Sequence, residues 1–216
     1  MLKTKVKANS ITNLTDARYF AAWEVEWLGF NLNQGAADYI EPTLLKAIKE
    51  WVDGVKFVGE FDLSSADEVN EIIQTLGLDA AQLGMFTPLA TFQQLEYATT
   101  LFKEIVIEKE TTLAAIKTHI EAFAPYVKAF VLNFDKNNIS WSDAQSHNHL
   151  DVAQLTTLCQ AFPIIFSLTM PPSTLIDFLA EVQPFGWSVK GGAEEKVGFK
   201  SFDELDDFFE VLEEEV

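Results

Sequence analysis

Cysteine is nearly absent from this chain of 216 residues, in which Cys159 stands alone. A single thiol cannot form an internal disulfide, so we expect a protein of the reducing cytoplasm. Long apolar runs are missing too, and none approaches the roughly 20 residues that a membrane-spanning helix needs. The first residues lead directly into a strand pattern and lack the apolar region of a secretion signal. These absences argue against a secreted or membrane-embedded protein.

Histidine and cofactor motifs are also scarce. His147 and His149 could hold a metal only in an extended loop with further ligands, and the sequence supplies no third ligand near them. No G-x-G-x-x-G motif follows the first expected strand, which argues against a dinucleotide site. We therefore expect neither a metal nor a cofactor.

Positive charge is in short supply. The chain has 15 lysines and arginines against 33 aspartates and glutamates, which gives a formal net charge of -18. This balance argues against nucleic acids and anionic membrane surfaces as partners. It leaves a small-molecule ligand as the expected partner, and an anionic ligand would need a locally positive or backbone-lined site. A monomer and a homodimer both remain open.

Short apolar, β-branched runs alternate with amphipathic helical stretches along the chain. Strands are expected at residues 4–8, 26–30, 54–60, 80–83, 104–107, 129–133, 164–167 and 186–189. Helices are expected at residues 16–22, 42–52, 66–76, 88–99, 111–123, 152–161, 173–181 and 202–214. Eight strand–helix units predict an α/β fold of one domain, residues 1–216, with eight parallel strands closed into a (β/α)8 TIM barrel. An open doubly wound sheet is the alternative.

Active sites of such barrels lie at the C-terminal ends of the strands. The residues at or just after the expected strand ends are Asn9, Asn31, Glu60, Gln82, Glu108, Asn133, Ser167 and Lys190. Glu60 and Glu108, together with Lys7 and Lys190, would form a charged cluster if all four pointed inward. A shift of one residue in the inward–outward alternation would turn them towards helices or solvent instead.

Four short stretches stand in the order and spacing of one barrel family. They are residues 11–17 (ITNLTDA), 28–30 (LGF), 76–83 (LGLDAAQL) and 189–194 (VKGGAE). With these stretches the chain resembles the phosphoribosylanthranilate isomerases, TIM-barrel enzymes of tryptophan biosynthesis. The resemblance implies a barrel whose mouth binds a substrate that carries a phosphate and a carboxylate.

The family's reaction is an Amadori rearrangement, which opens a phosphorylated aminoaldose and converts it into an aminoketose. The resemblance implies a cysteine as general base at the end of the first strand and an aspartate as general acid at the end of the sixth. Asn9 and Asn133 stand at these two positions. An amide side chain does not titrate near neutral pH, so neither residue can act as an acid or a base. The sequence thus predicts a divergent member without the two catalytic groups.

Binding positions of the family have changed as well. Gly84 stands where the family has a histidine after Gln-Leu, and Asp38 appears where an arginine is expected after the second strand. Pro171 and Pro172 replace the glycines after the seventh strand. Two prolines remove two backbone N–H donors, and such donors hold phosphate at a helix N-terminus.

Two main functions are compatible with these residues. A pseudoenzyme would bind a small polar or phosphorylated ligand at the barrel mouth. The expected ligand-binding residues are Lys7, Gln82, Lys190, Gly191 and Gly192. A working isomerase would need a substitute acid and base, for which Glu60 and Glu108 are the candidates. Another sugar-phosphate or enolising isomerisation that uses Glu60 or Glu108 is a third alternative.

Overall fold

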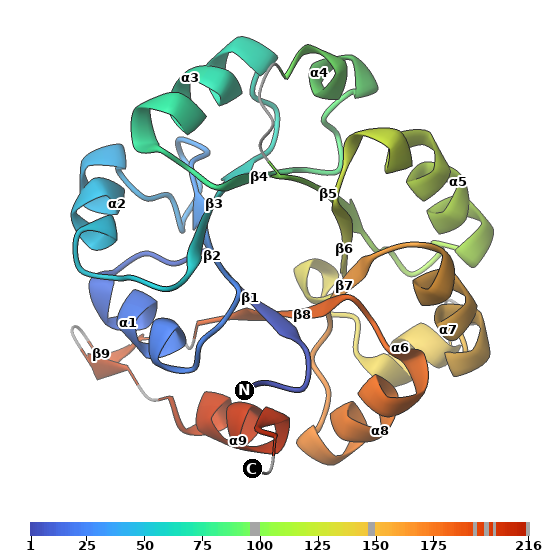
Figure 1. Ribbon diagram of the computed structural model, residues 1–216. Coiled ribbons are helices and arrows are strands. Elements are labelled where there is room, and N and C mark those ends of the chain that lie inside the picture. The colour runs from blue at the N-terminus through green and yellow to red at the C-terminus, as the bar shows by residue number, and fades with distance from the viewer. Residues whose placement is uncertain (96–99, 147–149, 192–193, 197–198, 201, 215–216) are drawn as a thin grey trace.

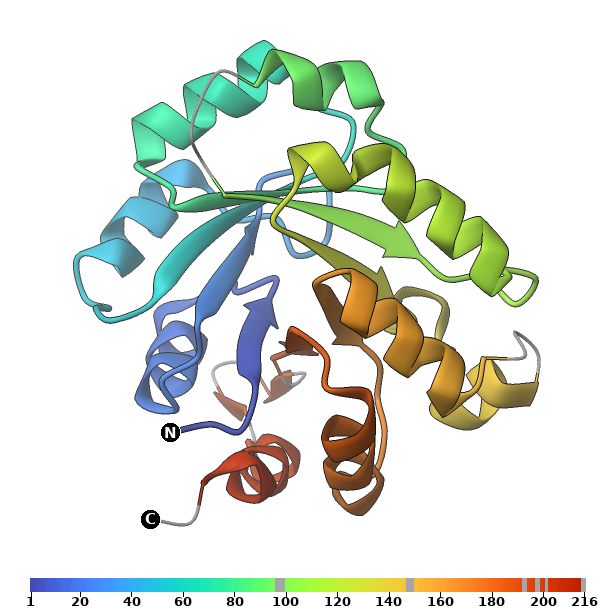
Figure 2. The same ribbon diagram turned by 45° about the vertical axis from the view of Figure 1, so that its right-hand side comes forward.

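Eight parallel strands form a closed barrel in the computed structural model, which describes residues 1–95, 100–146, 150–191, 194–196, 199–200 and 202–214. Each strand pairs with the next, and β8 pairs with β1 to close the ring (Figure 1). The helices surround this barrel on its outside (Figures 1 and 2). The predicted TIM barrel is therefore confirmed. His147, His149 and Gly192 lie outside the described residues.

The barrel strands are β1 (Lys5–Asn9), β2 (Trp27–Asn31), β3 (Lys56–Phe61), β4 (Ala80–Leu83), β5 (Thr100–Val106), β6 (Ala129–Asn133), β7 (Ile164–Ser167) and β8 (Gly186–Lys190). The helices are α1 (Leu14–Ala22), α2 (Pro42–Lys49), α3 (Ala66–Leu76), α4 (Leu89–Gln94), α5 (Leu113–Phe123), α6 (Trp141–Ser146), α7 (Val152–Ala161), α8 (Pro172–Val182) and α9 (Asp203–Leu212). Two 3-10 turns, η1 (Ala124–Tyr126) and η2 (Asp135–Asn137), flank β6. A two-stranded antiparallel sheet, β9 (Glu194–Lys196) and β10 (Phe199–Lys200), follows β8.

Strand β5 departs most from expectation. It was predicted over residues 104–107, but it runs from Thr100 to Val106. Lys103 and Glu104 are charged and lie in the middle of this strand, so the sequence there does not look like a buried strand. In the structure both residues are buried. The structure also adds α6 and the β9–β10 sheet, which the sequence did not predict.

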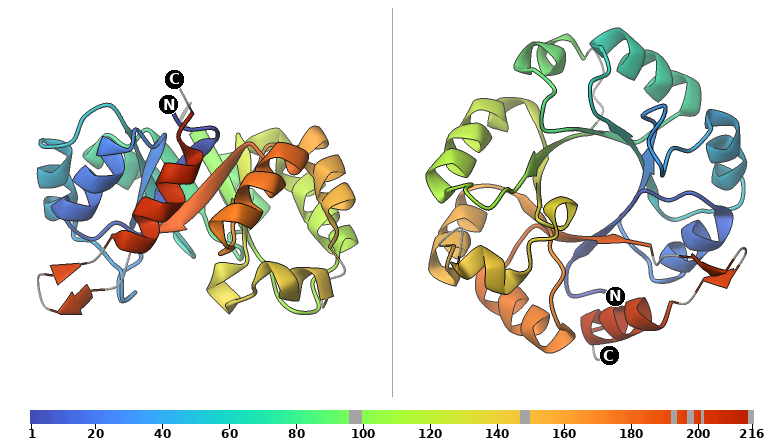
Figure 3. Two further views of the ribbon diagram at one scale, coloured as in Figure 1. Left: turned by 90° about the horizontal axis from the view of Figure 1, so that it is seen from below. Right: turned by 180° about the vertical axis from the view of Figure 1, so that it is seen from behind.

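Local signals explain several element boundaries. Ser65 caps α3 through a capping box with Glu68, and Gly77 ends the helix in a left-handed conformation at φ +58°. At the other end of the chain, α9 lies beside the N-terminal segment, where the Lys3 amide donates to the Leu212 carbonyl at 2.8 Å (Figure 3). These contacts complete the helical ring between α8 and α1. Within the described residues, no helix has the length and apolar character that crossing a membrane requires.

The barrel interior is filled from below by apolar side chains. Trp27, Val58, Phe102 and Ile165 belong to one buried cluster, in which the Trp27 and Phe102 rings meet edge to face at 5.4 Å. Side chains alternate along a strand, so residues two positions further on share this inner face. In β3 and β5 those residues are polar, and they form the floor and walls of the barrel mouth.

Candidate functional site

A cavity of about 370 Å³ opens at the C-terminal ends of the strands. Each barrel strand contributes a polar residue near its C-terminal end: Asn9, Asn31, Glu60, Gln82, Glu104, Asn133, Ser167 and Lys190. Seven of these eight were predicted from the expected strand ends. Loop residues complete the lining, among them Asp38, Asp62, Asp135 and Lys136.

Glu108 was placed wrongly at the end of the fifth strand. It lies two residues beyond Val106, is exposed, and donates its backbone N–H to Thr111 Oγ1 at 2.9 Å in the loop before α5. Glu104 stands at the mouth instead, because it lies two residues after the interior Phe102 on the same face of β5. The pattern of an apolar residue followed two positions later by a polar one recurs in β3 and β4, and it could have identified Glu104.

A buried ion pair lies at the base of the mouth. Lys7 is fully buried, and its Nζ lies 2.5 Å from Glu60 Oε1. Lys7 also donates to the side-chain oxygen of Asn9. Gly29 makes room for the pair, since a Cβ at this position would lie 2.1 Å from Glu60 Oε1. Lys7 does not line the cavity, so its ammonium holds Glu60 and Asn9 in place.

Asn9 and Asn133, at the ends of β1 and β6, are both engaged in hydrogen bonds. Asn9 Nδ2 donates to Ser188 Oγ at 2.5 Å, while its oxygen accepts from Lys7. Asn133 Nδ2 donates to Glu104 Oε1 at 2.7 Å, and its Oδ1 accepts from the Lys136 backbone N–H at 2.9 Å. Each amide therefore bridges two neighbours at the mouth.

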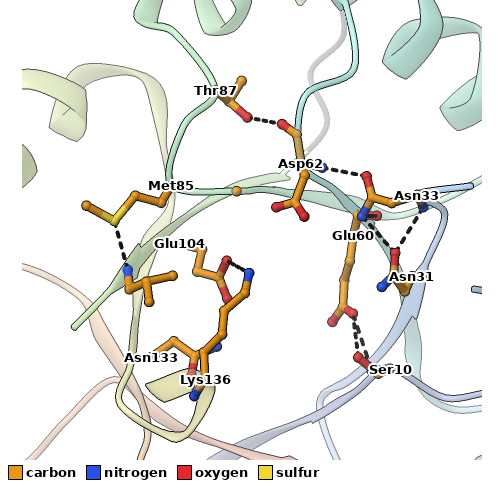
Figure 4. A network of polar contacts seen from close by, with 12 residues as sticks. Ser10, Asn31, Asn33, Glu60, Asp62, Met85, Thr87, Glu104, Asn133 and Lys136 are labelled. Carbon is orange, nitrogen blue, oxygen red and sulfur yellow. Dashed lines mark hydrogen bonds and ion pairs between the residues drawn. The ribbon is translucent and has the colours of Figure 1, made fainter. Parts of the chain in front are cut away.

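The ammonium group of Lys136 lies in a negative electrostatic environment. Its Nζ lies 3.2 Å from Glu104 Oε2 (Figure 4). Burial acts to lower the pKa of Lys136, but the carboxylates of Glu104, Asp62 and Glu60 outweigh it and raise this pKa above its ordinary value.

The carboxylate of Asp135 accepts hydrogen bonds from the donor groups at the end of β7. Asp135 accepts from Ser167 Oγ at 2.9 Å, and from the backbone N–H and Oγ1 of Thr169 at 2.8 and 2.9 Å. Pro171 is the N-cap of α8 and makes no side-chain cap, and Pro172 is its first residue. A phosphate at this place would have to compete with Asp135.

Lys190 at the end of β8 is largely exposed and pairs with Asp38 Oδ2 at 3.3 Å. Asn31 Nδ2 donates to the other oxygen of Asp38 at 2.6 Å. Burial acts to raise the pKa of Asp38, but hydrogen bonds from Ser10 and Asn31 and the charge of Lys190 hold it below its usual range. Gly191 directly follows β8.

Gln82 and Asp62 provide acceptors at the mouth. Gln82 is 7% exposed, and its Oε1 has no hydrogen-bond partner among the described residues. The Asp62 carboxylate lies over Gly84, where a Cβ would come within 2.1 Å of Asp62 Oδ1. The backbone of Asp62 is held by Asn33 and Thr87 (Figure 4). In the part of the chain that the structure describes, no three potential ligands are grouped to hold a metal ion.

These features define a small TIM barrel with a polar, carboxylate-rich mouth. No family model matches the chain, but comparison with known proteins finds sequences that are similar to it. The phosphoribosylanthranilate isomerase of Chlorobium chlorochromatii strain CaD3 is 39% identical over 83 residues, but that alignment spans only 38% of each chain. The isomerase of Maridesulfovibrio salexigens is 25% identical over 205 residues, which cover 93% of this chain and 94% of the relative.

Solved structures of isomerases with the same name have a fold similar to that of this chain. The phosphoribosylanthranilate isomerase of Thermus thermophilus superposes with a TM-score of 0.75 at 25% identity, over 97% of this chain and 98% of its own. Another isomerase of this name, in complex with reduced 1-(o-carboxyphenylamino)-1-deoxyribulose 5-phosphate, has a TM-score of 0.75 at 19% identity, with 97% and 98% covered. The chain thus resembles the phosphoribosylanthranilate isomerases along nearly its whole length, as its sequence motifs predicted.

Proposed function

We propose that this chain is a single-domain, diverged phosphoribosylanthranilate isomerase-like barrel that binds a small polar ligand at its mouth without isomerase turnover. The observation that carries this proposal is the state of Asn9 and Asn133. Each is an amide at a family catalytic position, and each has both ends of its side chain hydrogen-bonded within the protein.

The chemistry of the rearrangement makes these two changes costly. Ring opening needs a proton at the sugar ring oxygen, and the following step removes a proton from the adjacent carbon. A positioned general acid or base contributes about 10²–10⁴-fold in rate, so loss of both would slow turnover by about 10⁴–10⁸-fold if the effects multiply. The structure supports a binding role because the mouth retains its cavity while both groups are replaced.

A working isomerase with substitute groups is the second candidate. Glu60 and Glu104 both line the cavity, and they approach it from different strands (Figure 4). Either carboxylate could accept a proton from the substrate carbon. The names of the relatives favour this candidate, and Glu104 takes the part for which the sequence suggested Glu108.

One assay separates the two candidates. Phosphoribosylanthranilate is generated in situ, concentrated protein is added, and the loss of anthranilate-type fluorescence is followed against a protein-free control. We expect no turnover above the control. Turnover that is abolished by Glu60→Gln or Glu104→Gln and retained in Glu108→Gln would refute the proposal and establish the second candidate. Glu108→Gln is the matched control because it makes the same change outside the mouth.

A further inference from the structure

The charged groups at the mouth are predominantly carboxylates. Asp38, Glu60, Asp62, Glu104 and Asp135 line the cavity, whereas Lys136 and Lys190 are its lining ammonium groups. Even with Lys7 beneath the mouth, five carboxylates face three ammonium groups among the residues whose side chains the structure describes. Arg18 is the single arginine of the chain, and it is exposed on α1 rather than in the lining. The excess of negative charge disfavours an anion and favours a cation.

Gln82 gives independent evidence for a missing ligand group. Its side chain is more than nine-tenths buried, lines the cavity, and has an amide oxygen with no partner among the described residues. A buried acceptor without a donor costs free energy, so such a group calls for a donor from elsewhere. A ligand that brings N–H or O–H groups would satisfy it, whereas an unprotonated phosphate oxygen would not.

The neighbouring loop points to the same chemistry. The Asp62 carboxylate lies over Gly84 and accepts no hydrogen bond from any residue in the described ranges. Nearby, the ammonium of Lys136 already lies against Glu104, which shows that this wall accommodates a cation. The Asp135 carboxylate meanwhile takes the hydroxyl and amide donors of Ser167 and Thr169. Acceptors are therefore open at the mouth, while the Ser167 and Thr169 donors at the end of β7 are occupied.

We infer that the ligand of this mouth is a small polyhydroxylated amine, whose ammonium group lies among Asp62, Glu104 and Gln82. The inference rests on the proposed binding function for its location and adds the chemical class of the ligand. Hydroxyl groups suit the remaining amide and carboxylate acceptors. A phosphate group has no free donor set at the described end of β7 and meets repulsion from the carboxylates.

Three matched probes test this class by isothermal titration calorimetry on the full chain. 1-Amino-1-deoxysorbitol, sorbitol and sorbitol 1-phosphate share a six-carbon chain and differ only in the group on C1. We expect the amine to bind at least about tenfold more tightly than sorbitol, and the phosphate to bind most weakly. The preference for the amine should shrink as salt rises, because exposed charges are screened.

Variants assign the effect to the mouth. Asp62→Asn should weaken binding of the amine about fivefold or more and leave sorbitol nearly unchanged. Asp177→Asn makes the same charge change at an exposed position on α8 and should alter neither. Gln82→Met removes the unpartnered acceptor at similar side-chain length. It should weaken binding without lowering the thermal unfolding midpoint.

Several results would overturn the inference. They are equal affinity for the amine and sorbitol, tighter binding of the phosphate, no saturable binding of any probe, or equal effects of Asp62→Asn and Asp177→Asn. Failure of the proposed function is recognised separately, by turnover of phosphoribosylanthranilate in the fluorescence assay. A preference for the phosphate without turnover would refute the amine class and leave the binding function standing.

Discussion

The buried ion pair under the mouth allows a quantitative test of the structure. Lys7→Met preserves most of the side-chain length but removes the ammonium that contacts Glu60 and Asn9. Glu60 is 8% exposed, and its remaining donors are the N–H and Oγ of Ser10 at 3.3 and 3.4 Å. The variant therefore leaves a buried carboxylate with two long hydrogen bonds and no counter-charge.

The expected cost of Lys7→Met follows from this desolvation. Breaking a buried pair by removing one partner costs about 3–5 kcal/mol. For a chain of this size, each kcal/mol lowers the unfolding midpoint by roughly 2–4 °C, so a fall of about 6–20 °C is expected. Lys7→Met combined with Glu60→Gln removes both charges, and we expect it to recover most of this loss because replacing a whole pair is often nearly neutral.

Thermal and urea unfolding, followed by circular dichroism, measure these differences. Lys56→Met is the matched control, because Lys56 also lies 2.5 Å from a glutamate, Glu26, but its side chain is 57% exposed. An exposed pair contributes about 0–1 kcal/mol, so this control should be nearly silent. The reasoning fails if Lys7→Met costs no more than Lys56→Met, or if adding Glu60→Gln brings no recovery.

Three further predictions concern the mouth and its surroundings. Asn9→Cys with Asn133→Asp should not restore full isomerase activity in the fluorescence assay, because Asp135 still occupies the donors after β7; robust turnover would contradict this. Asp135→Ala should strengthen binding of inorganic phosphate several-fold in calorimetry, and an unchanged affinity would show that these donors are not available to an anion. Burial lowers the pKa of Lys103 from 10.5 to about 8, against the opposing charge of Glu104. Between these pH values the unfolded chain binds more protons, so stability rises with pH. The stability difference between the wild type and Lys103→Met should therefore grow in favour of the wild type from pH 8 to 10, and a constant difference would refute the shift.

Much of the barrel could be predicted from the sequence because its signals are local. Apolar strands alternate with amphipathic helices, and the end of each strand carries a polar residue that the barrel geometry brings to one mouth. This logic correctly placed residues such as Asn9, Gln82 and Asn133 around the cavity. This prediction required only the positions of the strand ends, and short patterns of a few residues determine those positions.

The fifth strand shows where local patterns are insufficient. Lys103 looks like a surface residue in the sequence, but its ammonium donates to the carbonyls of Gly84, Met85 and Thr87 at 2.7, 2.9 and 3.1 Å. The ring of Phe123, from α5, lies 4.5 Å from the same nitrogen. These partners come from segments 16 to 20 residues away on either side. Burial of Lys103 in the middle of β5 is therefore a tertiary effect.

The positions of Asp62 and Asp135 at the mouth could not be predicted from local patterns either. Asp135 meets Ser167 across 32 residues of sequence. Asp62 covers Gly84 only because two neighbouring loops come together at the barrel rim. These contacts join segments far apart in the sequence, so they became visible only in three dimensions.

The residues of the mouth depend on one another, which favours a site organised for a function over a decayed one. Gly84 is required for the position of Asp62, since any Cβ there would meet its carboxylate. Asp38 pairs with Lys190, and Asp135 is satisfied by donors at the end of β7. Random loss of an active site would leave several buried polar groups without partners. Among the described residues that line the cavity, Gln82 alone has such an atom. A mouth that pairs most of its charged groups and leaves the Gln82 oxygen and the Asp62 carboxylate open is organised for binding.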